Sequence, residues 1–226
     1  MKTKPAAVIL CGGESQRMGF PKWQLPFNGG NFQQTLLERL ISIIRPEVSK
    51  IILSVNDQPV ELFKDFETDG VVADFHSGSG PLEGIRTSLE FLADDCEAAF
   101  VTACDVPAFP SSVISHMTKR LTDEYQAVIP VDTVKENRRV FGMTAVYRCS
   151  THKAIKTLID QRRLKVSFLA DELKARIVDM QEMRTFDPNL DSLSNINIPK
   201  DYFAALEQLK LQTTSHVKTN LESSDN

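Results

Sequence analysis

The chain is short of the residues that build metal centres, disulfide frameworks and membrane segments. It has four cysteines and four histidines among 226 residues. The cysteines form no C-x-x-C pair and the histidines are scattered, which argues against a zinc site and a disulfide framework. No apolar run has the length of a membrane span, and Ala6–Leu10 is too short for a signal-peptide core. We therefore expect a cytoplasmic protein with reduced thiols and no membrane partner.

Positive charge is also scarce. Lysine and arginine total 26 against 30 acidic residues, which gives a formal net charge of −4 and argues against a general nucleic-acid binder. Any phosphate must then be bound by a local cluster of basic side chains. The hydrophobic fraction of 42% and the charged fraction of 25% are ordinary for a globular protein, and the length suits one domain.

Apolar runs alternate with amphipathic segments along most of the chain. Strands are predicted at Ala6–Leu10, Lys50–Val55, Gly70–Ala73, Ala98–Thr102, Ala127–Pro130, Val140–Tyr147 and Arg176–Asp179. Helical or amphipathic segments are predicted at residues 36–44, 59–66, 81–92, 113–121, 154–159, 166–173 and 199–211. Strands that alternate with helices imply right-handed βαβ units.

This alternation predicts an α/β protein, a Rossmann-like three-layer sandwich with a mostly parallel central sheet. Residues 1–211 should form a single domain, whereas residues 212–226 are polar, lack a pattern and should form a disordered tail. Ligands of such sheets bind beyond the carboxyl ends of the strands. The segments that directly follow strands should therefore converge on one functional edge.

The segment from Val8 to Lys22 carries the clearest chemical signal. Gly12 and Gly13 follow an apolar strand directly, and Arg17 and Lys22 come soon after. Glycines let backbone N–H groups approach an anion, and the two cations add positive charge, a combination that suits a nucleotide triphosphate. The spacing matches neither a Walker A loop nor a dinucleotide fingerprint. The alternative is an ordinary glycine turn with two solvated cations.

Two further segments follow predicted strands. Asp105 ends an apolar run and precedes Val106-Pro107, so it is either a turn-capping residue or a carboxylate that holds Mg²⁺ together with substrate phosphates. The glycine-rich segment from Asp74 to Gly84 is either a surface connection or a pocket for a base and ribose. On spacing alone, both alternatives stay open.

Basic residues also gather in the second half of the chain. Arg162 and Arg163 lie in one run, and Arg138 and Arg139 lie in a charged loop. Most such runs are solvated faces. If the acceptor substrate carries a phosphate, these arginines are candidates to hold it.

Two cysteines follow strands that should be neighbours. Cys11 follows the first predicted strand and Cys104 the fourth, and a doubly wound sheet of the expected order pairs those strands. They are either small packing residues or a thiol pair whose oxidation distorts the nucleotide loop.

With these motifs the chain resembles the molybdenum cofactor guanylyltransferase family, within the nucleotidyltransferases of glycosyltransferase-A-like, nucleotide-diphospho-sugar transferase-like fold. The resemblance runs from about Ala6 to Leu211. It is carried by four segments in order: Leu10–Lys22, Gly80–Gly84, Cys104–Pro107 and Asn195–Tyr202. It implies a nucleotide-binding half at about 1–110 and an acceptor-binding half at about 111–211.

The resemblance implies transfer of GMP from GTP to molybdopterin, with Mg²⁺ bound and pyrophosphate released. Transient contact with other cofactor-biosynthesis proteins is a further implication. The residues implied for GTP are Leu10, Cys11, Gly12, Gly13, Lys22, Asn56 (preferred to Ser54), Asp74, Gly80, Pro81, Leu82 and Asp105. Arg17, Lys22 and Asp105 are the expected catalytic residues, and Asp105 the metal ligand. The resemblance places the acceptor near Asn195 and Asn197, and the basic run described above adds Arg162 and Arg163 as candidates.

Two positions depart from the family pattern. Pro21 stands where an aspartate usually precedes the loop lysine, and Arg139–Met143 lacks the family's acceptor-side proline. Proline at the first position is common in cytidylyl- and sugar-nucleotide transferases, whereas the Gly12-Gly13 pair favours GTP. The alternatives are a nucleotidyltransferase with another NTP or acceptor (a molybdopterin cytidylyltransferase, or a sugar-phosphate or phospholactate nucleotidyltransferase) or a non-catalytic GTP-binding regulator.

Overall fold

One mixed sheet carries strands from both halves of the chain. The computed structural model describes residues 4–12, 18–27, 34–56, 58–75, 79–133 and 138–210. The strands of this part are β1 (Ala6–Leu10), β2 (Ile51–Ser54), β3 (Gly70–Val72), β4 (Ala98–Ala103), β5 (Ala127–Asp132), β6 (Arg139–Val140), β7 (Ala145–Arg148) and β8 (Ala175–Asp179). Their order is β3-β2-β1-β4-β7-β5-β6, and β8 pairs with β5.

The first half of the sheet is parallel and the second half is mixed. Strands β1, β2, β3 and β4 pair in parallel, whereas β7 is antiparallel to both β4 and β5. The predicted α/β fold with a mostly parallel sheet is confirmed. The parallel half sends the carboxyl ends of its strands to one edge, where ligands of such sheets bind.

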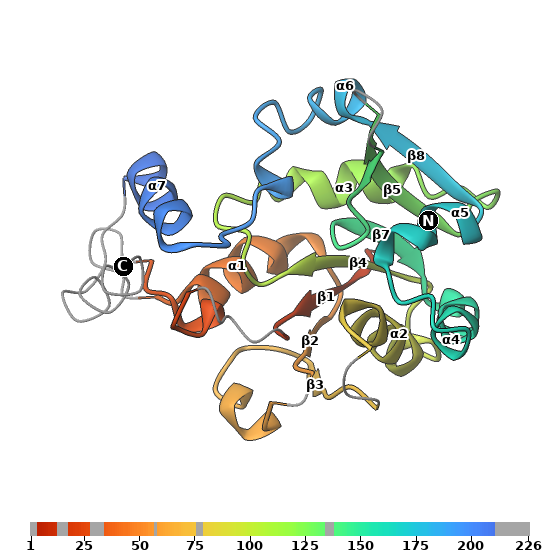
Figure 1. Ribbon diagram of the computed structural model, residues 1–226, viewed down its shortest axis with the longest axis horizontal. Coiled ribbons are helices and arrows are strands. Elements are labelled where there is room, and N and C mark those ends of the chain that lie inside the picture. The colour runs from red at the N-terminus through yellow and green to blue at the C-terminus, as the bar shows by residue number, and fades with distance from the viewer. Residues whose placement is uncertain are drawn as a thin grey trace.

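Helices cover both faces of the sheet. The described helices are α1 (Leu36–Ile44), α2 (Pro81–Leu92), α3 (Ser112–Lys119), α4 (His152–Asp160), α5 (Leu169–Glu172), α6 (Met180–Met183) and α7 (Pro199–Leu209). Helices α1 and α3 pack on one face, and α2 and α4 pack on the other (Figure 1). The strands of the parallel half are therefore nearly all apolar, as burial on both faces requires.

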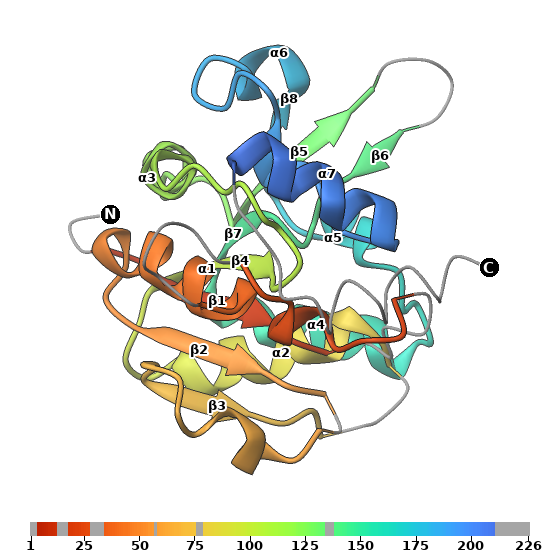
Figure 2. The ribbon, with the colours of Figure 1, turned by 90° about the vertical axis from the view of Figure 1, so that its left-hand side faces the viewer.

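The last helix builds a third, smaller core away from the sheet. Tyr202 and Leu206 of α7 pack against Met18, Leu25 and Phe27, and the Tyr202 hydroxyl donates a hydrogen bond to the Pro26 carbonyl. Figure 2 shows α7 on the opposite side of the molecule from β3. This packing ties the end of the domain to the segment that carries Lys22, although the two are far apart in sequence.

Some predicted boundaries were wrong. The apolar run Val140–Tyr147 is two strands, β6 and β7, because the chain turns at residues 141–144, where the Thr144 N–H donates to the Phe141 carbonyl. The segment predicted as a helix at 59–66 is a short 3-10 helix, Val60–Phe63. The predicted disordered tail, together with Gly13 and Arg17, lies outside the described residues.

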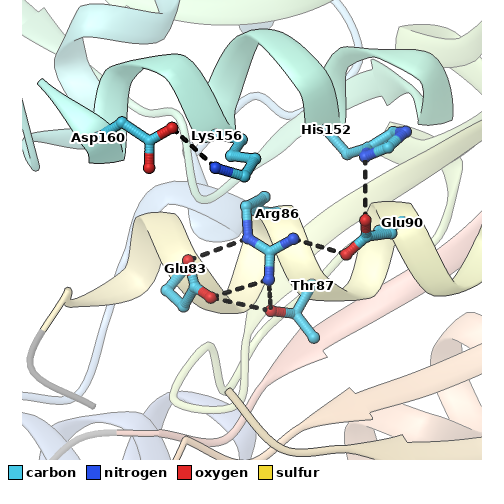
Figure 3. Close-up of polar contacts among 7 residues, drawn as sticks. All are labelled: Glu83, Arg86, Thr87, Glu90, His152, Lys156 and Asp160. Atoms are coloured by element: carbon cyan, nitrogen blue, oxygen red, sulfur yellow. Dashed lines mark hydrogen bonds and ion pairs between the residues drawn. The ribbon is translucent and has the colours of Figure 1, made fainter. Parts of the chain in front are cut away.

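A partly buried polar network joins α2 to α4. The Arg86 guanidinium donates to both carboxylate oxygens of Glu83 at 2.9 and 3.0 Å and to Glu90 at 2.6 Å. Glu90 also lies 3.8 Å from the His152 ring on α4 (Figure 3). Because Arg86 makes several charge-assisted hydrogen bonds, its charge is matched inside the protein.

Among the described residues, no helix is both long enough and apolar enough to cross a membrane.

Candidate active site

The carboxyl ends of β1 and β4 fix the centre of the candidate site. The Cys11 N–H donates to the Ser54 carbonyl at 2.7 Å, and the Cys104 N–H donates to the Leu10 carbonyl at 3.0 Å. These bonds continue the parallel ladders one residue past the strands. The start of the glycine loop and the Cys104-Asp105 pair therefore leave the sheet side by side.

Lys22 and Asp105 form an ion pair at this edge. The Lys22 Nζ lies 2.7 Å from Asp105 Oδ2, although the residues are 83 positions apart. Their side chains are 18% and 12% exposed. The loop lysine and the strand-end carboxylate, which were predicted separately, therefore meet at the edge of the sheet as a largely buried pair.

Two asparagines close the same cluster from the far end of the chain. Asn195 donates from Nδ2 to Asp105 Oδ1 at 2.8 Å, and Lys22 Nζ lies 3.5 Å from Asn197 Oδ1. The Ile196 N–H also donates to the Asp105 carbonyl at 2.9 Å. Both carboxylate oxygens of Asp105 are thus held by side chains, and the Asn197 side chain also contacts Lys22.

A second group of predicted residues lies along the edge toward β2 and β3. Gly12 faces Asn56 so closely that a Cβ at position 12 would lie 2.8 Å from Asn56 Cβ. The Asp74 N–H donates to the Asn56 carbonyl at 3.1 Å. A Cβ at Gly84 would lie 2.5 Å from Ser54 Oγ and 3.3 Å from Asp74 Oδ1. Glycine at both positions lets α2 and the loop pack against these polar groups.

The predicted Gly80-Pro81-Leu82 segment opens α2 beside this group. Gly80 has a φ of 66° and precedes the helix, Pro81 occupies its first position, and Leu82 is fully buried. Proline is suited to that position because a first-turn N–H lacks a helical partner anyway. Leu82 anchors the helix start in the core, which leaves the backbone of Gly80 at the edge.

A cavity of about 720 Å³ lies next to Asn195 and Asn197. Its walls come from β6 and the turn after it, from residues 193–197 and from α7, and they include Asn195, Asn197 and Arg139. The Arg139 guanidinium lies 4.7 Å from the ring centroid of Phe141, another wall residue. The cavity is large enough for a small-molecule ligand.

The other predicted arginines lie elsewhere. Arg163 pairs with Glu172 at 2.5 Å and lies over the Phe168 ring, and Arg162 is exposed just after α4 with a φ of 61°. Arg138 pairs with Asp171. Among the residues that the structure describes, neither Arg162 nor Arg163 lines the cavity.

Cys11 and Cys104 are neighbours, as their strand ends require. Burial raises the pKa of the Cys11 thiol well above its usual value, and a hydrogen bond with Cys104 adds to the shift. Both side chains belong to the core on the α1 face. The Cys11 thiol is therefore a neutral packing group at ordinary pH.

Comparison with known proteins assigns the chain to a family. Residues 7–176 match the MobA-like NTP transferase domain. A "probable molybdenum cofactor guanylyltransferase" of Methanosarcina acetivorans is 32% identical over 206 residues, which cover 87% of each chain. One from Carboxydothermus hydrogenoformans is 26% identical over 204 residues, which cover 90% of this chain and 96% of the other.

The chain belongs to the MobA-like NTP transferase family.

A solved structure agrees on the fold. The "molybdopterin-guanine dinucleotide biosynthesis protein A" from Archaeoglobus fulgidus superposes with a TM-score of 0.76 at 24% identity and covers 91% of this chain and 98% of its own. The MobA-like chain is accordingly an enzyme, a nucleotidyltransferase.

Two residues of this MobA-like transferase support the site and were missed by sequence reasoning. Gln58 donates to the Cys11 carbonyl at 2.8 Å and lies 3.3 Å from the Trp23 ring nitrogen, so it links the β1 end to the turn that carries Lys22. Asp201 accepts from the Asn197 N–H at 2.8 Å and fixes that asparagine at the start of α7. The Pro199-Lys-Asp201 order is a helix-start signal that could have shown the second.

The polar cluster around Asp105 in this MobA-like transferase has the chemistry to hold a divalent cation that is also bound by phosphate. The described residues include no group of three or more histidines, cysteines or acids placed to hold a metal. Mg²⁺ needs fewer protein ligands, because it binds through one or two carboxylates and takes other oxygens from substrate phosphates and water. An ammonium already lies 2.7 Å from Asp105 Oδ2, so that oxygen faces a position where a cation is stable.

Proposed function

We propose that the protein transfers GMP from GTP to the phosphate of molybdopterin, which forms the guanine dinucleotide cofactor and pyrophosphate. One observation carries the proposal. Lys22, Asp105, Asn195 and Asn197 form a single polar cluster between the glycine-loop edge and the cavity. A donor on one side and an acceptor on the other would therefore meet at this cluster.

On the donor side, each residue would bind a different part of GTP. Leu10, Cys11 and Gly12 would line the nucleotide, and Lys22 would neutralise its phosphates as a compact point charge. Asn56, Asp74 and the Gly80-Pro81-Leu82 turn lie toward β2 and β3, where the nucleoside would extend. Gly13 and Arg17 are assigned to the same loop from sequence alone.

Asp105 would hold Mg²⁺. The ion would supply positive charge that neutralises the phosphates of GTP as the leaving group departs. The Lys22 ammonium would exchange its place beside Asp105 Oδ2 for a phosphate oxygen when GTP binds. Lys22 and Asp105 are therefore the residues on which charge neutralisation depends.

The chemistry needs positioning more than proton transfer. A phosphate oxygen of the acceptor is already an anionic nucleophile, so no general base is required to activate it. That oxygen attacks the α-phosphorus of GTP in line, a new P–O bond forms, and the bond from the α-phosphorus to the bridging oxygen breaks as pyrophosphate leaves. Binding both substrates in this geometry supplies much of the rate enhancement.

On the acceptor side, the cavity beside Asn195 and Asn197 would receive molybdopterin. Arg139 lies on its wall and can pair with an anionic group of the acceptor. Arg162 and Arg163, which the basic run in the sequence suggests for the same task, would have to act from outside this wall. Arg139 is therefore the better placed candidate.

Pyrophosphate release is the direct test. The purified protein is assayed with each of the four NTPs and Mg²⁺, with and without molybdopterin. The proposal expects release with GTP only when molybdopterin is present. Release with CTP instead would indicate a cytidylyltransferase, and tight GTP binding without any release would indicate a non-catalytic regulator.

A further inference from the structure

We propose that the Phe75 ring stacks on the base of the bound nucleotide and so forms the outer wall of the nucleoside pocket. The inference deepens the proposed function and rests on its placing the nucleoside at the β2–β3 edge.

Phe75 is an apolar side chain that packing does not explain. It is 71% exposed, more than the other exposed large apolar residues of the described chain, which are Leu62, Phe91 and Ile198. Exposed aromatic rings are costly to leave in water, because a phenylalanine gains its stabilisation from burial. A ring held open beside a ligand site is therefore a candidate to be covered by the ligand.

The position of Phe75 in the fold matches the reach of a nucleotide. It directly follows Asp74, whose backbone bonds to Asn56 and whose carboxylate packs at Gly84. Strand β3 is the third strand from β4 in the sheet, so the two strands lie about 14 Å apart, given about 4.8 Å per strand. With the phosphates at Lys22, the base extends in this direction.

Arg86 supports the ring from one side. Its guanidinium carbon lies 5.3 Å from the Phe75 ring centroid, within the range of a cation–π contact. The same guanidinium is held by Glu83 and Glu90 (Figure 3), so its charge is already matched and its position is fixed. The contact steadies the ring, and the remaining exposed surface is available to a base.

Stacking of this kind strengthens binding without selecting a base. Every nucleobase has a flat face, and removal of one stacking aromatic side chain typically weakens binding about tenfold or more. Phe75 would thus add affinity for the nucleoside, whereas polar groups such as Asp74 would select the base. The contribution should be absent for a ligand that has phosphates but no base.

The test compares GTP with inorganic tripolyphosphate. Binding of each ligand to the wild type, Phe75→Ala and Phe75→Trp is measured by calorimetry at fixed Mg²⁺. We expect Phe75→Ala to weaken GTP binding about tenfold and to leave tripolyphosphate binding unchanged, whereas Phe75→Trp should bind GTP as tightly as the wild type. Unchanged GTP affinity, or an equal loss for both ligands, would overturn the proposal.

Phe91→Ala is the matched control. Phe91 is also an exposed phenylalanine, 57% accessible, but its ring lies against Gly70 at the opposite end of β3. This variant should bind GTP as the wild type does, and a similar loss would overturn the assignment to Phe75. If the wild type prefers CTP, the guanylyl assignment fails. A selective loss of CTP binding in Phe75→Ala would then still support stacking.

Discussion

The molecule contains two ion pairs that differ in sequence separation and in solvent exposure. Lys22 and Asp105 are 83 residues apart and meet at the open edge of the sheet. Arg86 and Glu83 are three residues apart on one helix, and their side chains are only 7% and 1% exposed. The first pair depends on the whole fold to form, and the second depends on one turn of helix.

The difference suggests separate roles, catalysis for the Lys22–Asp105 pair and stability for the Arg86–Glu83 pair. In the proposed function Lys22, whose ammonium lies at the end of a flexible alkyl chain, exchanges Asp105 for a phosphate. Arg86 is fixed by four hydrogen bonds to Glu83, Glu90 and Thr87. Moving its guanidinium would break these bonds inside the protein. We expect changes in the edge pair to alter turnover and changes in the helix pair to alter stability.

Removal of Arg86 should give the largest effect. Arg86→Ala removes the guanidinium that neutralises the buried Glu83 carboxylate, which costs about 3–5 kcal/mol of unfolding free energy. Urea denaturation measures the loss, and the Glu83→Met/Arg86→Met double variant is the control, because it removes both charges and should lose less. A single variant as stable as the wild type would show that the network contributes nothing. The folded fraction of Arg86→Ala should keep its kcat.

Asp105→Asn tests the other half of the comparison. The amide keeps the shape of the side chain and loses the charge, so turnover should fall about 10²–10³-fold, as when one preorganised electrostatic group is removed. Its unfolding free energy should change less than that of Arg86→Ala. Initial rates at saturating Mg²⁺ are the measurement, and wild-type turnover would remove Asp105 from the metal site.

Lys22 should show a smaller and partly reversible effect. Lys22→Ala removes a charge-assisted contact to phosphate, so kcat/KM for GTP should fall about 10–100-fold. Lys22→Arg should restore only part of kcat/KM for GTP, since the wide guanidinium group cannot occupy the position of the lysine ammonium. Steady-state kinetics over GTP concentration distinguish the two variants. Normal GTP binding and turnover in Lys22→Ala would contradict the phosphate role.

The sequence predicted the residues at this edge better than the way in which they meet. Apolar runs identified β1, β2 and β4, and Cys11 and Cys104 directly follow the ends of β1 and β4. Asn195 and Asn197 came only from the family motif, because no local pattern shows that residues near the end of the chain return to Asp105. That return depends on α7 packing against residues 18–27, a contact of long sequence separation.

The part of the chain around β6 and β7 was harder to predict for the same reason. Strands β6 and β7 form one apolar run in the sequence, and their separation depends on a turn that brings β7 between β4 and β5. Arg139 then lies on the cavity wall, whereas Arg163 forms an ion pair with Glu172. Charge in the sequence identified both arginines as candidates, and only tertiary structure tells them apart.

The two arginines give a matched test of the acceptor side. Arg139→Ala should raise the KM for molybdopterin about tenfold, the usual loss of one charged contact, and should leave the KM for GTP unchanged. Arg163→Ala removes the same charge away from the cavity and should change neither. The reverse pattern, with a loss only in Arg163→Ala, would support the assignment made from the basic run in the sequence and would show that the cavity is not the acceptor site.

The smallest effect is expected from oxidation of the thiols of Cys11 and Cys104, which lie next to the candidate site. Cys11 and Cys104 adjoin Gly12 and Asp105, yet burial raises the pKa of Cys11, so its reactive thiolate fraction near pH 7 is below that of a free cysteine and grows only at more alkaline pH. Mild peroxide treatment should therefore leave GTP-dependent turnover intact, whereas a thiol reagent should label the partly exposed Cys96 first. Loss of activity in the wild type, prevented by Cys104→Ala, would instead establish an oxidative switch.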